Sequence, residues 1–166
     1  MNYLTSKNRI ELLLIIIVIP VLGSLASYFL GFDKIHWSTV AHLIAILWQF
    51  ESILKLNRVL KGEFSITLTK ISFVIWIPLF TLSAYKMEPE TMLNFVNGEY
   101  STVFVIAGMA VNLTYFYIIY ILTRMYSRAT TGHDLSGIDL FPSYFYFVIY
   151  PIGIWKYQNQ LQELEK

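Results

Sequence analysis

Long, uninterrupted runs of apolar residues dominate this chain, in place of the alternating or amphipathic patterns of a water-soluble fold. Residues 12–30 contain no charged side chain, and a helix of that length, roughly 28 Å, crosses the hydrocarbon core of a bilayer. Comparable runs follow at residues 37–54, 68–85 and 102–122. The pattern therefore predicts an all-α integral membrane protein whose single domain consists of four transmembrane helices.

A fifth apolar stretch, residues 141–155, has a different character. It is shorter than the other runs, is rich in tyrosine and contains Pro142, Pro151 and Gly153. Aromatic residues with polar tips favour the headgroup level of a membrane, and a short segment broken by proline rarely crosses. We therefore expect an interfacial or re-entering aromatic segment in preference to a fifth crossing, followed by a cytoplasmic tail at residues 156–166.

The composition agrees with a membrane protein and excludes several kinds of chemistry. Hydrophobic residues make up 56% of the chain and charged residues only 14%, whereas a soluble domain carries about 25% charged residues. The chain has no cysteine and three scattered histidines, which excludes disulfides, thiol nucleophiles and thiolate metal sites. A net charge of +1 gives no general attraction to nucleic acid. We expect no catalytic residues, no metal, no cofactor and no nucleic-acid partner.

The basic residues predict the orientation. With four spans and a cytoplasmic N-terminus, the loop at residues 86–100 faces outward, and both termini lie in the cytoplasm. Ten of the 12 Lys and Arg residues then fall on the inner side, which is a strong positive-inside bias. These ten are Lys7, Arg9, Lys55, Arg58, Lys61, Lys70, Arg124, Arg128, Lys156 and Lys166.

Polar side chains inside the second predicted span are the main candidates for a functional site. An ionisable residue within a span is costly, so Glu51 is a candidate proton, ion or ligand site. It shares a helix face with Lys55 and Arg58, and we favour the simpler interpretation of a carboxylate paired near the cytoplasmic surface. His42 and Gln49 share the opposite face. They could line a polar path, although hydrogen bonds that hold neighbouring helices together are the more common role.

Small residues mark places where helices can approach closely. Gly23 and Ser27 form such a pair in the first span, and Gly108 lies one turn before Asn112 in the fourth. Asn112 is also a candidate polar group within the membrane. These residues predict tight helix packing within one chain or between copies of it, and we expect a homo-oligomer.

Aromatic and basic residues gather after the midpoint of the chain, on the predicted cytoplasmic side. The simplest explanation is anchoring at the membrane surface. The functional alternative is a groove or surface for lipid or for a cytoplasmic partner. The residues concerned are Arg124, Arg128, Tyr144, Tyr146, Tyr150 and Trp155.

Three classes of function remain open at this stage. The favoured hypothesis is a non-enzymatic subunit of the bacterial inner membrane that acts as sensor or effector with a cytoplasmic protein. In outline, a small polytopic chain without a soluble domain resembles membrane subunits of bacterial phage-defence operons. The alternative is a small oligomeric ion or proton channel or transporter that uses Glu51 and His42. An intramembrane enzyme is disfavoured because the sequence offers no paired acids, thiol, metal cluster or nucleotide-binding loop.

Overall fold

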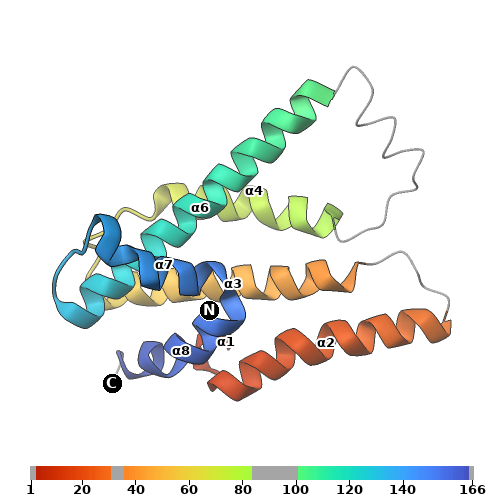
Figure 1. The fold of residues 1–166 in the computed structure, drawn as a ribbon, viewed down its shortest axis with the longest axis horizontal. Helices are drawn as coiled ribbons and strands as arrows, with labels where there is room; N and C mark the ends of the chain where they lie inside the picture. The colour runs from red at the N-terminus through yellow and green to blue at the C-terminus, as the bar shows by residue number, and fades with distance from the viewer. Residues whose placement is uncertain (1–2, 31–35, 84–100, 165–166) are drawn as a thin grey trace.

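The computed structural model describes residues 3–30, 36–83 and 101–164, and all regular elements in these ranges are helical. Four long helices form the body of the molecule: α2 (Arg9–Leu30), α3 (Trp37–Val59), α4 (Thr67–Ser83) and α6 (Ser101–Thr131). The shorter elements are α1 (Tyr3–Ser6), η1 (Gly137–Leu140), α7 (Phe141–Val148) and α8 (Tyr150–Glu163). These short elements gather at one end of the bundle, which we call the α8 end (Figure 1).

The four long helices run alternately away from the α8 end and back toward it (Figure 1). Two of them, α2 and α3, are long and apolar enough to cross a membrane, and α7 with α8 makes a third candidate if the bent pair counts as one span. The described part of α4 forms a shorter apolar helix, Thr67–Pro78. The protein is therefore all-helical in its described part, with two to three candidate spans. The count of four spans stays a prediction, and the predicted outer loop lies outside the described residues.

Residues 141–155 do not form one straight helix. The axes of the two helical stretches differ by 107° across the break at Ile149, and Pro142 and Pro151 each lie in the first turn of their helix, where proline is tolerated. A Cβ atom on Gly153 would lie only 2.4 Å from a backbone carbonyl oxygen of α7. Proline thus sets where each helix begins, and glycine allows the two to meet closely at an elbow.

Helix α8 continues past residue 155 to Glu163 and packs into the core; the cytoplasmic location predicted for residues 156–166 stays a prediction. Leu161, near its C-terminus, is fully buried. Much of the core lies where α3, α6, α7 and α8 meet at the α8 end. Its largest fully buried side chains include Trp48, Met125, Phe147, Ile154 and Leu161.

The outward faces of the long helices are strongly apolar. On α2, large hydrophobic side chains are exposed from Ile10 to Leu30, and α4 and α6 expose side chains such as Val74 and Leu113. Soluble monomers rarely expose contiguous apolar surface on this scale. A hydrocarbon environment removes the cost, so the distribution of exposed side chains is consistent with a membrane protein.

Candidate functional site

The carboxylate of Glu51 caps the N-terminus of the short helix α1. Its Oε2 atom accepts hydrogen bonds from the backbone N–H groups of Leu4 at 2.7 Å and Thr5 at 3.1 Å, and the side chain is only 2% exposed. The first N–H groups of a helix lack partners within the helix, and a negative charge at that end is favourable. Glu51 therefore supplies both the acceptor and the charge that α1 requires.

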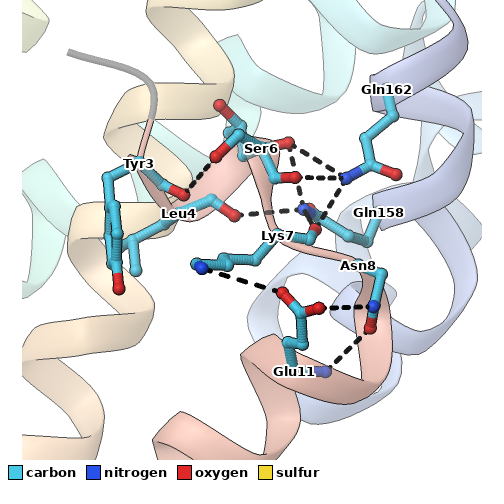
Figure 2. Close-up of polar contacts among 9 residues, drawn as sticks. Tyr3, Leu4, Ser6, Lys7, Asn8, Glu11, Gln158 and Gln162 are labelled. Atoms are coloured by element: carbon cyan, nitrogen blue, oxygen red, sulfur yellow. Dashed lines mark hydrogen bonds and ion pairs between the residues drawn. The ribbon is translucent and has the colours of Figure 1, made fainter.

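Two glutamines of α8 satisfy the opposite end of α1. Nε2 of Gln158 lies within hydrogen-bond distance of the carbonyl oxygens of Leu4 (3.1 Å), Thr5 (3.2 Å) and Lys7 (2.5 Å). Nε2 of Gln162 donates to the Lys7 carbonyl at 2.7 Å and reaches two further carbonyls of the same turn. Figure 2 shows both amides projecting from α8 toward this segment. The last carbonyls of α1 are thus covered by side chains from the far end of the sequence.

The Gln158 amide is itself held in place by α3. The indole Nε1 of Trp48 donates to Gln158 Oε1 at 2.7 Å, and both side chains are fully buried. Both ends of the amide are therefore engaged, which fixes its orientation. We call Glu51, Trp48, Gln158 and Gln162 together the α1 clamp.

The junction between α1 and α2 is closed by its own cap (Figure 2). Asn8 Oδ1 accepts the backbone N–H of Glu11 at 2.9 Å, and Glu11 Oε1 accepts the side-chain amide of Asn8 at 2.8 Å. This reciprocal pair works like a capping box. Lys7 adds an ion pair to Glu11 at 3.8 Å. The chain is thereby fixed as it leaves the α1 clamp and enters α2.

Gln49 performs a related task at the elbow. Its Nε2 donates to the carbonyl oxygen of Phe147 at 3.1 Å and approaches the hydroxyl of Tyr115 at 3.5 Å. Phe147 lies in the last turn of α7, where carbonyl groups lose their helical partners. In a membrane such groups must be satisfied by protein. Gln49 is 1% exposed, and its Oε1 has no hydrogen-bond partner among the described residues.

The structure does not join the candidate polar residues into one path. His42 lies on the exposed part of α3, where Nδ1 meets the Ser38 carbonyl at 2.7 Å and the ring packs edge-on to Tyr150. Asn112 lies exposed on α6. Glu51 bonds to α1, whereas Gln49 bonds to α7. The expected pairing of Glu51 with the basic residues of α3 stays a prediction.

The small residues of α2 face α3 of the same chain. A Cβ on Gly23 would lie 2.3 Å from the ring of Trp37, and the indole Nε1 of Trp37 donates to the Ser27 hydroxyl at 2.8 Å. This indole occupies the groove that the glycine leaves. Gly108 lies in α6, and its role in packing stays a prediction.

Cations lie on aromatic rings at the level where exposed side chains change from apolar to polar. The Arg9 guanidinium lies 4.3 Å from the ring centre of Trp155, and Lys156 Nζ lies 3.8 Å from that of Tyr146. Along α8 the exposed face changes at this point, since Trp155 is followed by Lys156 and other polar side chains. Aromatic and basic residues together are typical of a membrane–water boundary.

Two further basic residues of the predicted surface lie in ion pairs near the C-terminus of α6. Arg124 binds both carboxylate oxygens of Asp134, one of them at 3.0 Å, and Arg128 pairs with Glu63 at 3.2 Å. The hydrogen bond from Arg124 holds the pKa of Asp134 below its ordinary value. These pairs border a surface hollow of about 550 Å³ that also includes Phe64, Ser65 and Ile121.

The tyrosines of the predicted surface lie around the elbow. Tyr144, Tyr146 and Tyr150 are half-buried, and burial raises the pKa of Tyr144 and Tyr150.

Among the described residues, no group of three or more His, Cys, Asp or Glu side chains could hold a metal ion.

The α1 clamp was missed at the level of sequence apart from Glu51. Gln158 and Gln162 lie four residues apart in a polar stretch that resembles an ordinary solvated helix. The one available signal was their common helix face, shared with Leu161 within one turn.

Comparison with protein-family models, with curated proteins and with solved structures yields no match.

Proposed function

We propose that the protein is a four-span protein of the bacterial inner membrane with both termini in the cytoplasm, the spans being α2, α3, α4 and α6. The apolar outward faces of the long helices support this proposal. The basic residues support it as well, because every described member of the predicted inner set lies toward the α8 end or in the turns beside it. The α8 end is then the cytoplasmic end.

Cysteine labelling in intact cells tests this topology. Single cysteines replace Asn94 in the predicted outer loop and Asn159 on α8, and an impermeant maleimide is added. We expect labelling at position 94 alone. Labelling at 159 alone would contradict the four-span arrangement, and labelling at both would mean that the α7–α8 elbow crosses the membrane.

Within this frame we propose a non-enzymatic, self-associating subunit that acts as sensor or effector with a cytoplasmic protein. The observation that carries the proposal is that Glu51 and Gln49, two buried polar side chains of α3, serve as caps for other helices. Glu51 is committed to α1, and Gln49 donates to α7. Groups used in this way do not offer a continuous route for an ion. The basic and aromatic residues of the α8 end remain available for contact with a partner.

The alternative is an oligomeric channel or transporter that uses Glu51 and His42, and a flux measurement separates the two. Wild type and Glu51→Gln are reconstituted in liposomes, and dissipation of a pH or cation gradient is recorded. We expect no flux from either protein. Wild-type flux that the substitution abolishes, with the protein still folded, would overturn the subunit proposal in favour of the channel.

A photo-crosslinking amino acid locates the partner surface in living cells. It replaces Arg128 at the α8 end or, as a matched control, Val74 on the exposed apolar face of α4. We expect a discrete protein adduct from position 128 and none from position 74. Absence of an adduct at position 128 and at neighbouring positions of the same end would contradict a cytoplasmic partner there.

The proposal also includes self-association of the protein and a role in phage defence. Native mass spectrometry in mild detergent is expected to show more than one chain, and a monomer across detergents and nanodiscs would contradict the oligomer. A role in phage defence rests on the small polytopic outline of the chain. Plaque counts on cells with and without the gene test it, and equal counts over a broad phage panel would contradict it.

A further inference from the structure

The elbow between α7 and α8 presents an apolar face beside a cation. On α7, Phe141 is 64% and Phe145 48% exposed, and on α8, Ile152 is 45% and Trp155 52% exposed. The two phenylalanine rings stack on each other. About half of each of these four side chains is therefore open to the surroundings of the described structure.

Arg9 and Lys156 lie beside this face and differ from the other basic residues nearby. Lys7, Arg124 and Arg128 each form an ion pair with a carboxylate. Lys7 and Arg124 also lie near aromatic rings. Arg9 and Lys156 lie on aromatic rings as well, but neither forms an ion pair with a described carboxylate. Two cations are therefore presented without an internal counter-charge at the edge of an apolar surface.

We propose that Arg9 and Lys156 bind the phosphate groups of anionic phospholipids of the cytoplasmic leaflet, while Ile152 and Trp155 contact the acyl chains. This inference rests on the membrane location proposed above and adds the chemical class of the lipid. An aromatic ring beneath a cation fixes its position without neutralising it. The cation therefore keeps its attraction for an anion.

The arrangement favours a lipid over a soluble anion. A soluble phosphate compound needs only the cations and gains nothing from exposed apolar side chains. A phospholipid carries its charge at the boundary between water and hydrocarbon, and this is the level at which the exposed face of α8 changes from Trp155 to Lys156. Basic residues near an anionic membrane surface each contribute about fivefold to binding.

Fluorescence quenching by brominated lipids tests the proposal. The protein is placed in phosphatidylcholine vesicles that contain a minor fraction of brominated phosphatidylglycerol or, for comparison, the same fraction of brominated phosphatidylcholine. The signal of Trp155 is the difference between wild type and Trp155→Phe. We expect Trp155 to be quenched more strongly by the anionic lipid, with a lipid preference that falls about fivefold in Arg9→Gln and again in Lys156→Gln.

Lys61→Gln is the matched control. Lys61 is exposed and lies away from the elbow, so the substitution removes one positive charge without touching the proposed site. It is expected to leave the lipid preference unchanged, and Arg9→Lys with Lys156→Arg is expected to retain it. Equal quenching by the two lipids, or a preference that survives both glutamine substitutions, would overturn the proposal. Displacement of the anionic lipid by a soluble inositol phosphate at equal charge would assign the site to a soluble ligand and overturn it as well.

Flotation of the vesicles separates this result from failure of the proposed function. Protein that does not float with the vesicles would contradict the membrane location and, with it, the lipid site. Protein that floats without preferring the anionic lipid would overturn only the lipid site.

Discussion

Removing the charge of Glu51 should loosen α1 and leave the rest of the bundle folded. Its two hydrogen bonds to backbone N–H groups are charge-assisted and buried. Bonds of this kind contribute roughly 1.5–3 kcal/mol each, compared with roughly 0.5–1.5 for neutral ones. Glu51→Gln keeps an acceptor oxygen in a side chain of similar shape, so each hydrogen bond should weaken by about 1 kcal/mol. The free energy needed to open α1 should then fall by about 2 kcal/mol.

Glu51→Ala should have a larger effect, because it leaves two buried donors without a partner. Each unsatisfied group costs about 1–3 kcal/mol, so the opening of α1 becomes easier by about 2–6 kcal/mol. Hydrogen exchange of the segment at residues 3–7, measured by mass spectrometry in nanodiscs, reports this opening. A change of about 2 kcal/mol corresponds to roughly 30-fold faster exchange.

Glu63→Gln provides the control, since Glu63 is exposed and pairs with Arg128 at 3.2 Å. It should leave exchange in the α1 segment unchanged. If Glu51→Ala also leaves that exchange unchanged, the carboxylate does not hold α1, and the reasoning about the α1 clamp is refuted.

Three further outcomes follow from the geometry. Gly153→Ala places a Cβ 2.4 Å from the Tyr146 carbonyl oxygen, so the elbow must open and the thermal unfolding midpoint should fall. An unchanged midpoint would contradict the close approach. Gln49→Leu leaves the carbonyl it caps in α7 without its donor, at a cost of about 1–3 kcal/mol, which faster exchange around the elbow would report. The pKa of Asp134 is lowered in the folded state. Its pairing with Arg124 therefore stabilises the fold above the unfolded-state pKa, and this stabilisation is lost as the pH falls through the folded-state pKa. Asp134→Asn should accordingly lower the unfolding midpoint modestly at neutral pH and have no such effect in strong acid.

The positions of the helices followed from the sequence where a single physical signal decided them. Long apolar runs located α2 and α3, because a long apolar run has no other stable arrangement in a membrane. The prolines and the short length of residues 141–155 predicted an interfacial or re-entering segment in preference to a crossing. The structure shows two helices whose axes differ by 107°, and the position of this pair relative to a membrane stays a prediction.

The partners of the polar residues did not follow from the sequence. The sequence suggested Lys55 and Arg58 as partners of Glu51, which stays a prediction, but it gave no sign of the hydrogen bonds from Leu4 and Thr5. Local spacing says nothing about which distant helix end lies beside a side chain.

The α1 clamp also constrains the order in which the protein can be completed during synthesis. The amides that satisfy the carbonyls of α1 belong to Gln158 and Gln162, which are synthesised about 150 residues after α1. Until α8 emerges, these amides are absent and the last carbonyls of α1 lack their cover. Closing of the α1 clamp therefore waits for the synthesis of α8, and a chain cut before α8 would keep α1 without this cover.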